Sequence, residues 1–411
     1  MCTHAMMQEG ISPGWFMQFS ILSSFLIILS IALTVAIICR LLKLPVILGY
    51  LFVGILVGPH NLGWLPSTDK IKILADFGVV LLMFTVGLEF SVSKLYMLRR
   101  SAFFVGTFQV LFCIVTTTWV ALFFKIDLVP ATIIGSIVAM SSTAIVMKQL
   151  TDQSELNTRY GLHAMGILLF QDLAVIPILV FIVAFTNNAH PLYGQTILRA
   201  LLKGVIAISV ILIAGKLFLG PLFQFIARMK HVEIFTLAVL LVSVGSSWIS
   251  HELGLSYALS AFIAGMMLAE CEHKSQIKSE IRPFRDVLLG LFFISIGMLA
   301  NVPEWITNWQ WILLFLSALM IGKPLVIVIL SIFTRYDLST SVRTGLLLAQ
   351  GGEFGFAILF LILRDNLIPE VWGQSILAGM LISFLCSPIF IRYNREITQF
   401  FLGKQNKIIE S

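Results

Sequence analysis

One acidic residue stands deep inside a long apolar run and is the clearest candidate for chemistry in the chain. Asp172 lies about 11 residues into the run 161–186, beside Gln171, with no basic residue within a helical turn. An acid at the centre of a bilayer costs at least about 2.5–3.5 kcal/mol, so such a residue indicates an ion pathway. A carboxyl there can hold a proton or a cation, but not both. We therefore expect Asp172 to carry ions, with the neutral Gln171 as a ligand beside it. The alternative is a capped acid at a helix–helix contact.

Two clusters of small polar residues lie at a similar depth in two other apolar runs. They are Ser141, Ser142 and Thr143 in the run 128–149, and Gly351, Gly352 and Glu353 in the run 339–363. Such residues permit a helix to unwind, and unwound backbone at membrane depth is tolerated only against protein or a watery cavity. Hydroxyl, carbonyl and carboxylate oxygens together suit an alkali cation. We expect two broken helices and a monovalent cation site formed by Asp172, Gln171 and the first cluster. The alternative for the serines is close helix packing with hydroxyls bonded to their own backbone.

Among the other charged residues inside apolar runs, two are candidates for the site. Glu353 is either a second cavity carboxylate or a charge that balances helix ends and pairs with a lysine, and the sequence does not separate these roles. Lys323 is expected to be a counter-charge where the broken helices meet, although a snorkelling lysine is the alternative.

The composition decides what kind of elements must position these residues. Of the 411 residues, 58% are apolar and 12% are charged, whereas soluble proteins have about 45–50% and about 25%. The mean hydropathy is +0.98. These values exclude a soluble enzyme, a disordered protein and a nucleic-acid binder. The five cysteines show no metal-binding spacing.

Runs of about 20 apolar residues cross roughly 30 Å of hydrocarbon, and the chain has thirteen that we predict to be transmembrane helices. They are 19–40, 43–59, 71–90, 101–124, 128–149, 161–186, 196–226, 232–250, 255–271, 285–301, 309–334, 339–363 and 371–391. With this division, 19 of the 27 Lys and Arg residues fall on one side of the membrane and four on the other. Because positive charge marks the cytoplasmic side, we expect a multi-pass protein of the plasma (inner) membrane. Residues 1–18 would then be external and 392–411 a cytoplasmic tail.

An internal repeat relates the two halves of the domain 19–391 at an offset of about 210 residues. Gly54 corresponds to Gly265, Gly87 to Gly297, and the Ser-Ser-Thr cluster to the Gly-Gly-Glu cluster. Repeat one covers 19–186, the connector helix 196–226, and repeat two 232–391. A shift of seven spans reverses every helix, so these are expected to be inverted-topology repeats with two crossed discontinuous helices, spans 5 and 12.

Five ordered motifs resemble the second monovalent cation:proton antiporter family, and in particular its Kef-type potassium/proton branch. The motifs occupy 77–89, 141–146, 168–177, 290–298 and 350–354. The resemblance implies an all-α fold with a six-helix core domain, a dimerisation domain and an elevator-like movement. It also implies that Asp172 is the aspartate that carries cation and proton. A Gln-Asp pair is typical of potassium-type, electroneutral members.

The function expected from the residues and the resemblance is therefore potassium/proton antiport by a homodimer, not enzymatic catalysis. Sodium/proton antiport and a channel-like potassium efflux system are the alternatives. No cofactor is expected in this chain. Kef proteins continue into a domain that binds nucleotide and glutathione, so such regulation is expected only if a further C-terminal domain exists.

Overall fold

The computed structural model describes residues 21–42, 45–59, 61, 69–89, 100–186, 217–229, 231–252, 257–269, 271, 273–364 and 367–402. The expected external segment 1–18, most of the connector 196–226 and the end of the tail lie outside the described residues. Within the described residues all regular structure is helical.

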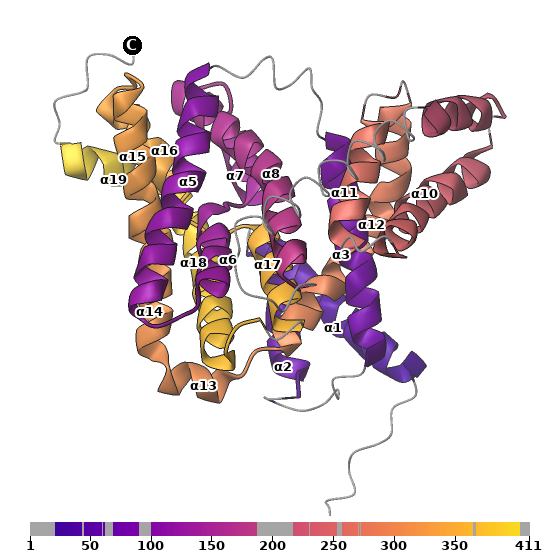
Figure 1. Ribbon diagram of the computed structural model, residues 1–411, viewed down its shortest axis with the longest axis horizontal. Helices are drawn as coiled ribbons and strands as arrows, with labels where there is room; N and C mark the ends of the chain where they lie inside the picture. The colour runs from indigo at the N-terminus through magenta and orange to yellow at the C-terminus, as the bar shows by residue number, and fades with distance from the viewer. Residues whose placement is uncertain are drawn as a thin grey trace, which may run out of the picture.

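The helices form two groups, which Figure 1 shows on the left and on the right. We call the first group the site bundle. It consists of α5 (Arg100–Phe123), α6 (Leu128–Ala139), α7 (Thr143–Asp152), α8 (Arg159–Thr186), α13 (Val302–Thr307), α14 (Trp309–Ser317), the π-helical turn η1 (Ala318–Gly322), α15 (Lys323–Phe333), α16 (Leu338–Leu347), α17 (Glu353–Arg364), α18 (Glu370–Arg392) and α19 (Asn394–Leu402). We call the second group the glycine bundle. It consists of α1 (Ile21–Leu41), α2 (Val46–Val57), α3 (Asp69–Glu89), α10 (Val232–Glu252), α11 (Tyr257–Leu268) and α12 (Lys274–Met298).

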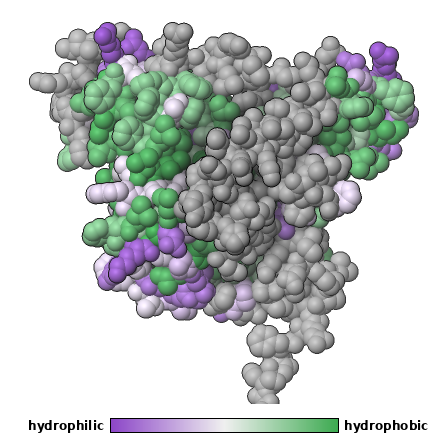
Figure 2. All heavy atoms as spheres, in the orientation of Figure 1, coloured by the Kyte–Doolittle hydropathy of each residue, from purple (hydrophilic) through white to green (hydrophobic). Residues whose placement is uncertain are grey.

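Among the described residues, five helical stretches are long and apolar enough to cross a membrane. They are Phe103–Phe123, Leu128–Asp152, Arg159–Ile182, Trp309–Phe333 and Glu370–Arg392, and several shorter apolar helices accompany them. Large apolar side chains such as Trp119 and Phe123 are 77% and 82% exposed. On the face in Figure 2, hydrophobic side chains cover much of the described surface, and hydrophilic ones gather toward the upper and lower ends. This distribution is that of a multi-pass membrane protein.

The predicted spans and their matching helices begin and end within a few residues of one another, except at α12, whereas α13 and α19 match no predicted span. The apolar run was expected to begin at 285, but α12 begins at Lys274, so the prediction of a loop before it is wrong. The additional turns are polar, and hydropathy cannot distinguish a polar helix from a loop. Near the point where the helix becomes apolar, the side chains of Arg282 and Asp286 approach to 3.7 Å across one turn.

Glycines bring the backbones of the glycine bundle into direct contact. Gly54 of α2 lies against Gly297 of α12, and a Cβ added to Gly54 would lie 2.0 Å from the carbonyl oxygen of Ile294. Gly87 of α3 lies against Gly265 of α11, where a Cβ added to Gly265 would also lie 2.0 Å from a backbone oxygen. The two contacts exchange under the offset of about 210 residues, because Gly54 corresponds to Gly265 and Gly297 to Gly87.

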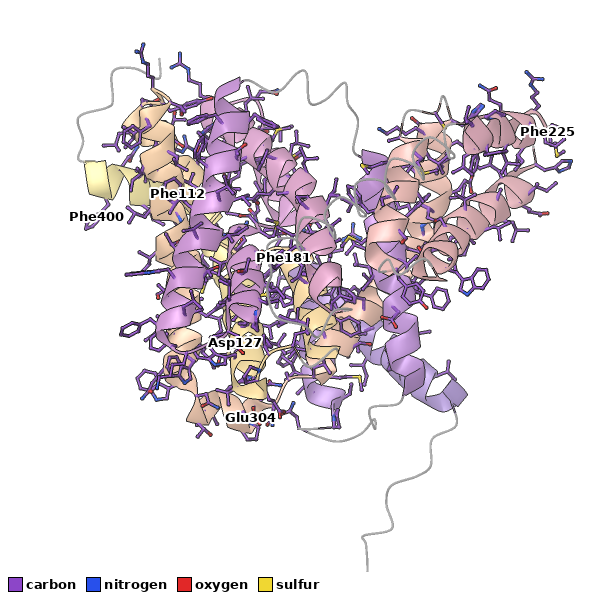
Figure 3. All side chains as sticks on the ribbon, in the orientation of Figure 1. Phe112, Asp127, Phe181, Phe225, Glu304 and Phe400 are labelled. Carbon is purple, nitrogen blue, oxygen red and sulfur yellow. The ribbon has the colours of Figure 1, made fainter. Side chains whose placement is uncertain are left out.

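The same turn leads into each interrupted helix of the site bundle. Lys125 and Arg335 have φ values of 61° and 65° and end α5 and α15 with matching backbone hydrogen bonds. Two residues later, Asp127 and Asp337 start α6 and α16 with nearly identical backbone angles. Asp127 is labelled in Figure 3, at the lower part of the site bundle. The two turns therefore lead into the two interrupted helices with the same backbone geometry.

The helices expected to break are both interrupted at the predicted clusters. Residues 140–142 separate α6 from α7, and residues 348–352 separate α16 from α17. Helix α8, which carries Asp172, continues through Pro177 without interruption.

We predict that Gly54→Ala lowers the melting temperature of the detergent-solubilised protein, and that Gly265→Ala lowers it similarly. The added methyl group would force apart two backbones in contact, at a cost of about 1–3 kcal/mol. The control is Gly245→Ala, because a Cβ there would meet only one leucine methyl group, at 4.0 Å. That change should be neutral or slightly stabilising, since Ala favours helix over Gly. Equal melting temperatures for all three variants would contradict the tight contact.

Candidate functional site

The two interruptions lie directly against each other. The Ser141 hydroxyl donates to the carbonyl oxygen of Leu348 at 3.0 Å. A Cβ added to Gly352 would lie 2.8 Å from the carbonyl carbon and oxygen of Ser141. Because a side chain would clash with backbone there, only glycine permits this approach. The segment before α7 and the segment before α17 are thus joined as one structural unit.

A buried lysine donates hydrogen bonds to a backbone carbonyl group in each of the two interruptions. Lys323 is 1% exposed, and its Nζ donates to the carbonyl oxygens of Met140 at 2.9 Å and Gln350 at 2.5 Å. Met140 caps the C-terminus of α6, and Gln350 follows the end of α16. Carbonyl groups at helix C-termini carry partial negative charge. One ammonium group therefore lies at both negative helix ends, directly after the π-helical turn η1.

A carboxylate and a hydroxyl accept hydrogen bonds from backbone N–H groups at the start of α7. Oε1 of Glu353, the first residue of α17, accepts from the backbone N–H of Ala144 at 3.4 Å. The Ser142 hydroxyl oxygen accepts from the backbone N–H of Ile145 at 3.3 Å and caps α7. Backbone N–H groups at helix N-termini carry partial positive charge. Glu353 thus lies at the positive ends of both α7 and α17.

Asp172 faces a cavity of about 1500 Å³ beside these interruptions. Its Oδ1 accepts a hydrogen bond from the Thr143 hydroxyl at 3.2 Å. Thr143 and Glu353 also line the cavity, so three of the predicted site residues meet at one space. Other lining residues include Asn157 before α8, Arg159 at the start of α8, and Arg335 in the turn between α15 and α16.

Gln171 turns away from this cavity, although the sequence predicted it as a ligand beside Asp172. Its Oε1 accepts from the backbone N–H of Ser141 at 2.9 Å, and its Nε2 donates to Oε1 of Gln109 at 2.8 Å. Gln171 is 1% exposed and does not line the cavity. The structure therefore brings Gln171 to the interruption of α6 and α7.

Sequence reasoning missed two residues that hold the interruptions. Gln109 of α5 donates to the carbonyl oxygen of Ala139 at 3.1 Å. The Ser383 hydroxyl of α18 accepts from the backbone N–H of Gly351 at 3.1 Å. The only available signal was a lone polar residue within an apolar run. Such residues are common enough in membrane helices that this signal alone does not predict a role.

The arrangement combines two carboxylates, Asp172 and Glu353, with one hydroxyl and charge-balanced helix ends at the edge of a cavity. This chemistry is suited to holding a single proton or a monovalent cation. The described residues contain no group of three or more His, Cys, Asp or Glu side chains that could hold a metal ion.

Comparison with known proteins identifies the family. The family model for the transmembrane sodium/hydrogen exchanger matches residues 27–392 of the chain. The chain belongs to the sodium/hydrogen exchanger family. Among solved structures, the exchanger fold is similar to that of the sodium proton antiporter MjNhaP1 from Methanocaldococcus jannaschii at pH 8. The TM-score is 0.69 at 16% sequence identity, over 93% of this chain and 99% of that one.

Curated relatives of this exchanger carry potassium in their names. The putative K(+) efflux antiporter KefB from Alkalimonas amylolytica is 39% identical over 365 residues, which are 88% of this chain and 55% of that protein. The chloroplastic K(+) efflux antiporter 2 from Arabidopsis thaliana is 36% identical over 352 residues, 84% of this chain and 29% of that protein. The exchanger chain thus spans about half the length of the first relative and under a third of the second. These relatives are transporters and not enzymes, and they confirm the resemblance to Kef-type antiporters.

We predict that Lys323→Met lowers the melting temperature by roughly 5–10 °C, because two buried carbonyl groups lose charge-assisted hydrogen bonds. The measurement is a thermal melt of the purified protein in detergent. The matched control is Lys148→Met, which removes an exposed lysine of α7 and should leave the melting temperature within about 2 °C. If both variants melt alike, Lys323 does not stabilise the interruptions.

Proposed function

We propose that the chain is a secondary active antiporter that exchanges a monovalent cation, potassium in the first place, for protons. The observation that carries the proposal is the Asp172 carboxylate, which faces the cavity and accepts a hydrogen bond from Thr143 at the start of a half-helix. Membership of the exchanger family supports it. Exchange needs no bound cofactor in this chain, and nucleotide or glutathione control would require a further domain.

Asp172 is the shared carrier in this mechanism. The ionised carboxylate binds the cation together with the Thr143 hydroxyl and further oxygens at the interruption. A proton that binds to the carboxyl removes its charge, and the cation leaves. Because proton and cation compete for one charge, each cycle exchanges one for the other without net charge movement. Lys323 and Glu353 compensate the helix ends of two crossed half-helix pairs and do not carry the ion.

Alternating access follows from movement of the site bundle along the glycine bundle. All of the proposed ligands belong to the site bundle, whereas α3 and α12 of the glycine bundle supply apolar residues together with Thr85, Lys278 and Arg285 to the same cavity. An elevator-like displacement would carry the ligands together and leave their geometry intact. We further propose that the protein is a homodimer formed through the glycine bundle, in the plasma (inner) membrane, with its C-terminus in the cytoplasm. The cavity, whose lining includes basic loop residues, then faces the cytoplasm.

We predict that Asp172→Asn abolishes cation/proton exchange while the protein still folds. The amide has nearly the same shape as the carboxyl but cannot exchange a proton at physiological pH. The measurement is proton efflux from proteoliposomes that contain a pH-sensitive dye, after addition of potassium to the outside. Asp152→Asn, at the exposed end of α7, is the control and should retain exchange. Exchange in Asp172→Asn at the rate of the control would overturn the carrier assignment.

We predict that potassium dissipates an imposed proton gradient in these proteoliposomes more effectively than sodium. The potassium efflux names of the relatives at 39% and 36% identity favour this cation. The reverse order would indicate a sodium/proton antiporter. This is the second candidate, because the fold is similar to that of a sodium proton antiporter.

The same vesicles separate an antiporter from a channel-like efflux system. A potassium gradient should drive protons against their own gradient, because the two fluxes are coupled at Asp172. A channel would let potassium pass without uphill proton movement.

A further inference from the structure

Two buried amide side chains close a ring of hydrogen bonds across the interruption of α6 and α7. The backbone N–H of Ser141 donates to Oε1 of Gln171 at 2.9 Å, and Nε2 of Gln171 donates to Oε1 of Gln109 at 2.8 Å. Nε2 of Gln109 then donates to the carbonyl oxygen of Ala139 at 3.1 Å. The ring starts and ends on the same interruption, two residues apart. All four residues are at most 1% exposed, so water cannot replace a missing partner.

The direction of the ring is fixed by its two backbone ends. A backbone N–H can only donate and a carbonyl oxygen can only accept. Gln171 must therefore present its oxygen to Ser141 and its amino group to Gln109. Gln109 must present its amino group to Ala139 and its oxygen to Gln171. Nε2 of Gln109 also lies 3.3 Å from Sγ of Cys113, which occupies its second N–H.

This direction has a consequence for residue 171. An ionised carboxylate there could still accept from Ser141, but its second oxygen would face the oxygen of Gln109 at about 3 Å with no hydrogen between them. Two buried acceptors in contact are unfavourable, and the clash is relieved only if the carboxyl keeps a proton. Position 171 must therefore supply a hydrogen-bond donor.

We propose that Gln109 is a positioning and specificity-determining residue, which requires a donor at residue 171 and so prevents residue 171 from adding a negative charge beside Asp172. Gln109 touches no ion and acts through Gln171. The functional consequence of the proposal, exchange without net charge movement, rests on the proposed antiport function. The ring itself is independent of that function.

The first test uses melting temperature and needs no transport. Gln171→Glu and Gln109→Glu each replace one amino group of the ring by an oxygen of nearly the same size. In the unfolded chain a glutamic acid ionises above about pH 4, whereas in the ring it must keep its proton. Relative to the wild type, both variants should therefore lose stability as the pH rises from 5 to 8, by roughly 5 °C.

The matched control is Gln276→Glu, which makes the same change on the polar first turns of α12, outside the ring. This carboxylate is partly exposed, so the control should follow the wild type at every pH. If the two ring variants also follow the wild type across the pH range, the proposal is wrong.

The second test measures charge movement by the full chain on a solid-supported membrane. Gln171→Glu should exchange potassium for protons without net current throughout the pH range in which this variant loses stability, because the folded carboxyl keeps its proton there, and a current should develop only above that range. A current of constant size at every pH would mean that Gln109 does not control the charge of residue 171. If the wild type shows no cation-driven proton flux at all, the proposed function fails. The melting series then still decides whether the ring requires a donor.

Discussion

Two helices are interrupted inside a buried core, and the backbone groups that these interruptions free must find partners there. Lys323 binds a carbonyl group in each interruption, and Glu353 accepts from the first turn of α7. The amides of Gln109 and Gln171 satisfy one carbonyl and one N–H more. Most polar side chains of the site thus serve the backbone and not an ion. Asp172 lies on an uninterrupted helix, and the hydrogen bond from Thr143 links its carboxylate to the first interruption.

The two halves of the molecule share a scaffold and differ in chemistry. The turns at Lys125 and Arg335 and the glycine contacts at Gly54 and Gly265 match at an offset of 210 or 211 residues. At the same offset the interruptions differ, because hydroxyls in the first stand where glycines and a carboxylate stand in the second. Glycine at 352 allows the backbone of Ser141 to approach, so the difference is what permits the contact. Two interruptions of the Ser-Ser-Thr type could not pack in this way, because residue 352 must be glycine. The repeated scaffold therefore accommodates an asymmetric centre.

Much of this could be predicted from the sequence, because membrane spans depend on local hydropathy and the interruptions on local clusters of glycine and hydroxyl residues. The polar start of α12 could not, since its residues are equally consistent with a loop. The orientation of the Gln171 side chain could not be predicted either. Its neighbour in the chain is Asp172, so the sequence suggested a shared site. The side chain is instead oriented by Ser141 and Gln109, 30 and 62 residues away in sequence. The partners of a buried amide depend on tertiary contacts, and a single sequence does not carry that information.

The division of labour between the bundles gives the proposed movement a physical basis. Asp172, Thr143 and Glu353 belong to the site bundle and form one wall of the cavity, while Leu82 of α3 and Leu289 of α12 belong to the opposite wall. Backbone contact at glycines makes that opposite wall stiff, since it leaves no flexible side chains between its helices. Between the bundles, by contrast, the rings of Phe292 and Phe293 meet those of α17 at centroid distances of 5.8 and 5.9 Å. Aromatic contacts of this kind have no fixed donor and acceptor, so they can be exchanged at small cost when one surface moves along the other. The proposed displacement would therefore occur at the interface between the bundles, and it would change access to Asp172 without disturbing its ligands.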